Sequence, residues 1–181
     1  RTAWGDVRQG IWMAVVRAGL LRLRREADPK NWRPHILVLS GAPTKRWHLI
    51  ELASDFTQNR ALLTVSTALT TPELKIERQK KMEENIREYM LNRGVNGLVR
   101  VFYASDPFEG SKKLVETYGL GQLVPNTILL GDSESEANEA QYCDMVQHIY
   151  RSDRNVLIVR DNKELIYRQR KRIDIWWGGL K

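Results

Sequence analysis

Apolar residues gather in five short runs along the chain, and longer stretches with helical spacing separate them. The runs lie at 36–39, 61–67, 98–103, 127–130 and 156–159. Short runs without a regular polar alternation are typical of parallel strands buried on both faces. The stretches between them predict helices at 45–58, 73–93, 106–118 and 133–151. The sequence therefore predicts an α/β fold: a doubly wound, mostly parallel five-stranded sheet.

Several residues carry helix start signals. Asp106 is a predicted N-cap, with proline at the first helical position and Glu109 at N3. Thr44 is a predicted N-cap for the helix at 45–58. Ser133 and Glu136 have the spacing of a capping box for the last helix. These signals place the helix starts immediately after the strands.

The helix predicted at 73–93 is mostly polar on its surface. Two oppositely charged pairs with i,i+4 spacing are expected to stabilise it, Glu77–Lys81 and Glu83–Arg87. Gly94 suits the position just beyond the helix end, where a left-handed conformation is common.

A long helix is predicted before the sheet, at 3–27, and Asp28-Pro29 ends it. Its apolar residues form two adjacent stripes: Trp4, Val7, Ile11, Val15 and Ala18, then Trp12, Val16, Leu20 and Leu23. Because such a wide surface needs cover on more than one side, we expect this helix to pack on the domain and on a further partner. After the sheet, 165–167 and 173–177 predict two more extended pieces.

Composition fits one globular domain. The 181 residues are 42% hydrophobic and 28% charged, which argues against disorder. No segment approaches the roughly 20 apolar residues that span a bilayer. The single cysteine, Cys143, excludes an internal disulfide and is expected to be a small buried side chain.

The net charge of +7 is compatible with nucleic acid, anionic lipid or a solvated face. Two clusters supply much of it: Arg17, Arg22, Arg24, Arg25, Lys30 and Arg33, then Arg168, Arg170, Lys171 and Arg172. A basic surface beside a membrane on the cytoplasmic side is a further reading. Because no nucleic-acid readout motif accompanies the clusters, a solvated or membrane-facing surface is the favoured interpretation and nucleic acid is not an expected partner.

Ligand-binding residues are expected in the loops after the strands, because doubly wound sheets bind ligands there. The turn after the first strand offers a candidate anion or nucleotide site of four residues: Ser40, Gly41, Thr44 and Lys45. It lacks a phosphate-loop motif, and Pro43 removes a backbone donor. After the fourth strand, Asp132, Glu134 and Glu136 would repel phosphate.

Beyond that turn, no catalytic, metal or cofactor site is predicted. His35, His48 and His148 lie far apart without metal-ligand spacing, and His35 is expected to be a satisfied core or edge histidine. Cys143 and His148, at i,i+5, would lie on different helix faces, which argues against a nucleophile–base pair. The protein is therefore expected not to be an enzyme.

Three motifs resemble one known family. They are Trp4-Gly5 with Asn31-Trp32-Arg33-Pro34 and Leu37-Val38-Leu39-Ser40-Gly41-Ala42-Pro43; then 119–131, which reads GLGQLVPNTILLG; and Ile173-Asp174-Ile175-Trp176-Trp177 with Gly178-Gly179-Leu180. In this order they are similar to the cytoplasmic C-terminal domain of the cation-chloride cotransporters. The acidic residues after Gly131 differ from animal members and favour a prokaryotic or divergent one.

The resemblance implies a Rossmann-like, universal-stress-like half-domain of a transporter that couples chloride to Na⁺ and/or K⁺. Residues 1–30 would link to the membrane domain, 31–162 would form the α/β half, and 163–181 would lead as a basic connector and strand to a second half. The implied partners are the transmembrane domain of the same polypeptide and a second copy, at the cytoplasmic face of the cell membrane. The implied roles are dimerisation and regulation. The alternative is a free-standing nucleotide-binding protein of the universal-stress type.

Overall fold

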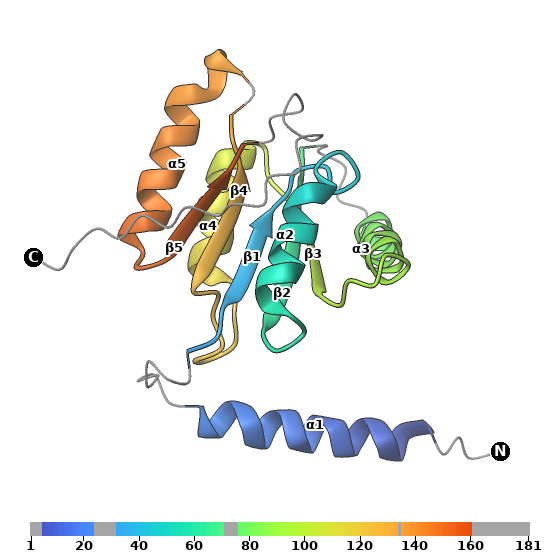
Figure 1. Ribbon diagram of the computed structural model, residues 1–181. Helices are drawn as coiled ribbons and strands as arrows, with labels where there is room; N and C mark the ends of the chain where they lie inside the picture. The colour runs from blue at the N-terminus through green and yellow to red at the C-terminus, as the bar shows by residue number, and fades with distance from the viewer. Residues whose placement is uncertain (1–4, 24–31, 71–75, 134, 161–181) are drawn as a thin grey trace, which may run out of the picture.

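Five parallel strands form the centre of the protein (Figure 1). The computed structural model describes residues 5–23, 32–70, 76–133 and 135–160. The strands are β1 (His35–Leu39), β2 (Leu62–Leu69), β3 (Leu98–Tyr103), β4 (Thr127–Gly131) and β5 (Asn155–Val159). Their order in the sheet is β3-β2-β1-β4-β5. The predicted doubly wound parallel sheet is confirmed, and the strand order reverses between β1 and β4.

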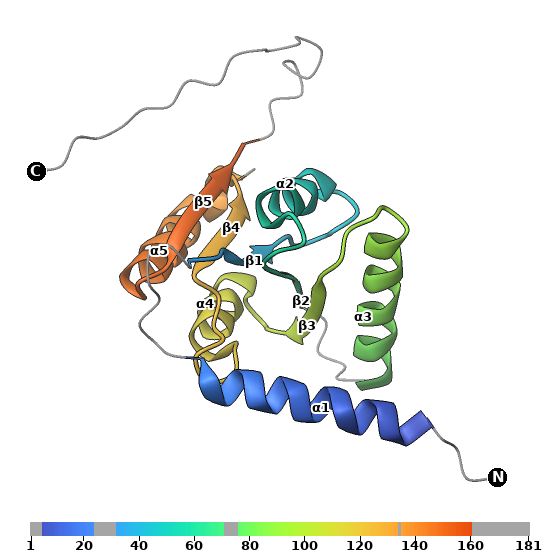
Figure 2. The ribbon, with the colours of Figure 1, turned by 60° about the horizontal axis from the view of Figure 1, so that its bottom comes forward.

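Helices cover both faces of the sheet (Figure 2). They are α2 (Trp47–Thr57) and α3 (Ile76–Leu91) on one face, and α4 (Pro107–Thr117) and α5 (Glu139–Arg151) on the other. A further helix, α1 (Gly5–Arg22), lies beyond the edge where the strands begin (Figure 1). The chain winds from β1 toward β3 and later from β4 to β5, in the opposite direction across the sheet. Because each crossover is right-handed, the two windings place their helices on opposite faces.

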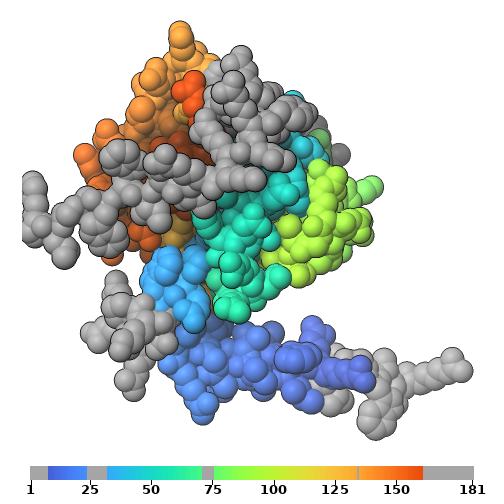
Figure 3. Space-filling model, viewed as in Figure 1, coloured from blue at the N-terminus to red at the C-terminus, as the bar shows by residue number. Residues whose placement is uncertain are grey.

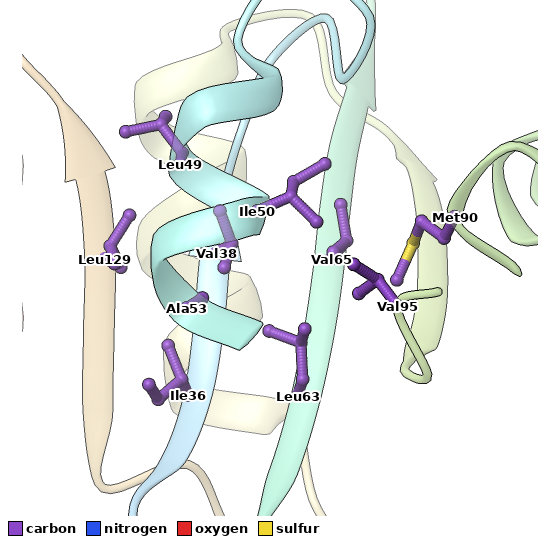
Figure 4. Close-up of a cluster of buried hydrophobic side chains, with 10 residues drawn as sticks. All are labelled: Ile36, Val38, Leu49, Ile50, Ala53, Leu63, Val65, Met90, Val95 and Leu129. Carbon is purple, nitrogen blue, oxygen red and sulfur yellow. The ribbon is translucent and has the colours of Figure 1, made fainter. Parts of the chain in front are cut away.

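Each face has its own core. The cluster beneath α2 and α3 is drawn in Figure 4: Ile36, Val38, Leu49, Ile50, Ala53, Leu63, Val65, Met90, Val95 and Leu129. The other face buries Leu37, Leu114, Val115, Ile128, Leu130, Met145 and Ile149. Alternate residues of β1 serve opposite cores, as the two-residue period of a strand requires. The unbroken apolar runs in the sequence therefore reflect burial on both sides.

Some helix starts differ from the predicted ones. Asp106 caps α4 as expected, since its Oδ1 accepts a hydrogen bond from the backbone N–H of Phe108 at 2.7 Å. Thr44 does not cap α2: the amides of Lys45 and Arg46 donate to the Ala42 carbonyl, so a turn delays the helix to Trp47. The prediction for Thr44 was wrong because Thr44 and Lys45 lie in this turn, before the helix begins.

The predicted capping box of Ser133 and Glu136 is also wrong. The hydroxyl of Ser133 donates to the Ser135 carbonyl, and a short 3₁₀ turn, η2 (Glu136–Asn138), precedes α5. The last helix therefore begins at Glu139, six residues after the predicted cap.

The surface charges of α3 pair differently from the prediction. Arg87 lies 3.6 Å from Glu84 across one turn, whereas Glu83 accepts a hydrogen bond from the backbone of Val101 on β3. Glu83 therefore bonds to the edge strand β3 and not to Arg87, the partner that the helix spacing predicted. Gly94 adopts φ of +75° beyond the end of α3, as predicted.

The first helix is shorter and more isolated than predicted. It ends at Arg22, with Leu23 already outside it. Its side chains from residue 8 onward are exposed, apart from the partly covered Leu20. The expectation that α1 packs on the domain was wrong for the part of the chain that the structure describes; in Figure 3 it runs along the underside of the body. No helix in the described ranges is long and apolar enough to cross a bilayer.

Cys143 is exposed, contrary to expectation. The buried face of α5 is formed by Met145 and Ile149, and Cys143 points away from it. The helix end predicted at Asp28-Pro29 and the extended pieces at 165–167 and 173–177 fall outside the described residues. So do half of the first basic cluster and all of the second.

Candidate functional site

A pocket of about 370 Å³ opens at the edge where the strands end, beside the point where the strand order reverses. Its inner wall is apolar and its rim is polar; the main contributors are Leu39, Leu130, Phe102, Phe108, Arg46 and Tyr142. Open α/β sheets generally bind ligands at this place. We call this pocket the carboxyl-edge pocket.

Buried hydroxyls behind the pocket hold two strands together. Ser40 Oγ donates to the Ser66 carbonyl at 3.1 Å, and Ser66 Oγ donates to the Val38 carbonyl at 3.0 Å. Ser40 is fully buried and does not line the pocket. Ser40 therefore has a structural role, because its hydroxyl links β1 to β2.

The four residues of the predicted anion turn are only partly brought together. Gly41, at φ of +63°, lines the pocket. Thr44 and Lys45 are exposed on the turn and are not among the lining residues. The cation of this turn that lines the pocket is Arg46, the neighbour of the predicted Lys45. Its position depends on the extra turn before α2, which no local signal predicted.

Arg46 lies against Gly131 at the end of β4. A Cβ at residue 131 would sit 3.0 Å from Arg46 Nη1, so the guanidinium occupies the space that a side chain would take. Opposite, the Tyr142 hydroxyl donates to the Gly131 carbonyl at 3.0 Å. Gly131 is thus enclosed by a cation on one side and a phenol on the other, both lining the pocket.

The rim of the pocket has mixed charge. Burial first, and then the charge of Asp132, raise the pKa of Tyr142 to about 12, while the charge of Arg46 acts in the opposite direction. Asp132 lies 3.5 Å from Arg160 and accepts the backbone N–H of Ser133. A carboxylate on the rim disfavours a polyphosphate. The arrangement suits a small ligand with an apolar body better than a triphosphate.

A second pocket, of about 410 Å³, lies on the α4 side where the strands begin. His35 forms part of its wall and is 8% exposed, but neither ring nitrogen has a partner in hydrogen-bonding geometry among the described residues. Burial lowers the pKa of His35, the Val124 backbone partly opposes this, and the charge of Arg154 lowers it further. The expected burial of His35 is confirmed, whereas no side chain of the described residues satisfies its ring nitrogens.

The other candidate groups lie apart. His148 Nε2 on α5 is hydrogen-bonded to Glu116 Oε1 on α4 at 2.8 Å, while Cys143 faces solvent. Within the described ranges, no three histidine, cysteine or acidic residues converge as they would around a metal ion.

The sequence matches the family model "Solute carrier family 12" over residues 46–175. The chain belongs to solute carrier family 12. This membership confirms the resemblance to cation-chloride cotransporters that the three motifs indicated, and it places the chain in a family of transporters rather than enzymes.

Members of solute carrier family 12 from several animals align with most of the chain. It is 28% identical over 130 residues to "Solute carrier family 12 member 2" of Homo sapiens, covering 71% of this chain and 11% of that protein. It is 26% identical over 165 residues to "Solute carrier family 12 protein B0303.11" of Caenorhabditis elegans, covering 77% and 18% respectively. The chain thus spans less than a fifth of the length of these relatives.

Solved structures with a similar arrangement include universal stress proteins. One, in complex with cAMP, has a TM-score of 0.49 at 15% identity and covers 71% of this chain and 98% of that one. Another, from Archaeoglobus fulgidus in complex with dAMP, has a TM-score of 0.46 at 11% identity, covering 70% and 97%. Because both TM-scores are below 0.5, the fold of this chain is assigned from the strand order of its own sheet.

Proposed function

We propose that this chain is a non-enzymatic cytoplasmic domain of a cation-chloride cotransporter, and that it serves assembly and regulation. The transporter would couple chloride to Na⁺ and/or K⁺, with ion binding in a transmembrane domain of the same polypeptide. Membership of the transporter family supports the proposal. The observation that carries the assembly role is the uncovered apolar surface of α1.

Large apolar side chains of α1 face solvent in the described chain. Trp12 is 68% exposed, Leu21 is 72% exposed, and Ile11, Met13, Val15 and Val16 are more than half exposed. Burying apolar surface yields about 25 cal/mol per Å², so a helix of this kind gains stability from a partner surface. We assign that surface to the membrane domain and to a second copy of the domain.

Self-association of the chain tests this assignment. Sedimentation equilibrium over a wide concentration range should show a reversible monomer–dimer equilibrium. Trp12→Lys should weaken it by at least about tenfold, which corresponds to about 1.4 kcal/mol. Gln9→Lys, also on an exposed position of α1, is the matched control and should leave the equilibrium unchanged. A chain that stays monomeric throughout, or responds equally to both changes, would contradict a dimerising α1.

The alternative is a nucleotide-binding function, which the position of the carboxyl-edge pocket favours. The carboxylate of Asp132 on the rim opposes it, because it places negative charge where phosphates would lie. Titration calorimetry with ATP distinguishes the two readings. Saturable binding that Arg46→Ala abolishes and the exposed Lys45→Ala leaves intact would favour a nucleotide site in the pocket.

A further inference from the structure

Four leucines are exposed at the edge of the sheet where the strands begin. Leu62 starts β2 and Leu98 starts β3, and these side chains are 36% and 52% exposed. Leu91, the last residue of α3, is 52% exposed, and Leu120, in the turn after α4, is 65% exposed. Two backbone hydrogen bonds between Leu120 and Leu123 close that turn and hold Leu120 outward. A single exposed leucine needs no explanation, but a contiguous group of them indicates a contact surface.

Two hollows join these leucines into one surface. The second pocket, of about 410 Å³, is lined by Leu62, Leu98 and Leu120. A neighbouring hollow of about 490 Å³, on the α3 side, is lined by Leu62, Leu91 and Leu98. Because Leu62 and Leu98 belong to both, the apolar surface is continuous across the starts of β2 and β3. We call these four leucines the amino-edge patch.

Arginines surround the amino-edge patch. Arg100 lines the pocket on one side and Arg87 lines the hollow on the other. Arg60 precedes Ala61, which also lines the hollow, and all three arginines are exposed. Arg87 lies 3.6 Å from Glu84, and both of these side chains remain largely open to water. The surface therefore has an apolar centre and a cationic margin.

Helix α1 lies beyond the same edge of the sheet (Figure 2). Its arginines, Arg8, Arg17 and Arg22, are also exposed. Like charges repel, so α1 of this chain or of a second copy is a poor occupant of the amino-edge patch. A surface that is anionic outside and apolar inside complements both the arginines and the leucines.

We propose that the amino-edge patch binds the surface of an anionic membrane. The guanidinium groups would bind lipid phosphates, for which their planar fork of donors is suited, and the leucines would enter the boundary between headgroups and acyl chains. Anionic lipids attract such a basic margin. This contact goes beyond the proposed function, because it orients the domain with its strand starts toward the membrane.

Vesicle sedimentation with the whole chain tests the role of the arginines. The chain should sediment with phosphatidylcholine vesicles that contain about 30% phosphatidylserine, and much less with phosphatidylcholine alone. Replacing Arg60, Arg87 and Arg100 together by Gln should weaken binding at least about tenfold. The matched control replaces Arg78, Lys80 and Lys81 by Gln, an equal change of charge at exposed positions near the start of α3. Absence of binding to the anionic vesicles, or equal weakening by both triple variants, would overturn the proposal.

A fluorescent label separates the amino-edge patch from α1. In a Cys143→Ser background, Leu120→Cys and Ile76→Cys each receive an environment-sensitive dye; both positions are 65% exposed, and Ile76 lies at the opposite end of α3 from Leu91. The same anionic vesicles should shift the emission of the dye at residue 120 to the blue and leave the dye at residue 76 unchanged. No shift at residue 120, as expected if α1 alone binds lipid or if a protein covers the patch, would overturn the proposal, as would equal shifts at both positions. Neither experiment depends on self-association, so a failure here leaves the proposed assembly role to its own test.

Discussion

Asn126 and His35, 91 residues apart, are joined by a hydrogen bond of 2.9 Å from the His35 backbone N–H to the Asn126 side-chain oxygen. The amide nitrogen of Asn126 donates in turn to the Arg33 carbonyl at 2.8 Å. One side chain thereby fixes the starts of β1 and β4, the two strands between which the winding direction reverses. The family motif at 119–131 has a structural role at this point.

Asn126→Leu should destabilise the domain by about 2 kcal/mol, because it leaves the His35 N–H and the Arg33 carbonyl without their partner. Urea unfolding followed by circular dichroism measures the change. Asn92→Leu, at an exposed position after α3, is the control and should shift stability by no more than about 0.5 kcal/mol. Equal effects of the two substitutions would rule out the proposed role of Asn126.

Two glycines of the same motif should respond differently to alanine. At Gly119, with φ of +141°, a Cβ would lie 2.6 Å from Val124 Cγ1 and 2.8 Å from the Leu123 carbonyl oxygen. At Gly121, with φ of +58°, nothing lies within 4 Å. Gly121→Ala should cost about 1 kcal/mol from backbone strain alone, and Gly119→Ala about 3 kcal/mol or more, because a steric clash is added. The order of their thermal midpoints checks this, and a reversed order would contradict the geometry of the turn.

Tyr142→Phe should cost about 1 kcal/mol at neutral pH, through loss of the hydrogen bond to Gly131. Because the pKa of Tyr142 is raised from 10.0 to about 12, its protonated form contributes stability that is complete below pH 10 and is lost as the pH rises through about 12. Alkaline absorbance titration should show one late-titrating phenol in the parent that Tyr142→Phe removes. A titration curve that the substitution leaves unaltered would exclude this assignment.

His35 should make stability pH-dependent on the acid side. Its pKa in the folded protein lies below the ordinary value of 6.5, so the unfolded chain binds the proton more readily. The contribution is present above pH 6.5 and declines as the pH falls toward the lowered value in the folded state. Denaturation midpoints measured between pH 7 and 5 should fall less steeply in His35→Leu than in the parent. Parallel profiles would contradict the buried neutral imidazole.

Features that depend on adjacent residues could be predicted from the sequence. The strands at 36–39 and 98–103 and the cap at Asp106 are of this kind, because burial on both faces and a capping side chain leave local patterns. Thr44 failed as a cap because a backbone hydrogen bond decides where α2 starts. Glu83 pairs with β3 instead of Arg87 because tertiary contact outweighs helix spacing.

The carboxyl-edge pocket shows the same limit. Its position follows from the predicted doubly wound sheet, but the identity of its cation does not: the turn at 42–45 sets Arg46 against Gly131 and leaves Lys45 outside. Arg46, Gly131 and Tyr142 are far apart in the sequence and form no motif. For α1, the wide apolar surface predicted cover that the described part of the chain does not supply.

The gene that encodes this chain provides the most direct test of a transporter domain. Its sequence upstream of Arg1 should encode several hydrophobic segments of about 20 residues, the last of them shortly before α1. That result would place the domain next to a membrane part and make α1 the connection between them. An upstream region without such segments would contradict the proposed function, and the carboxyl-edge pocket would then be the first site to screen for ligands.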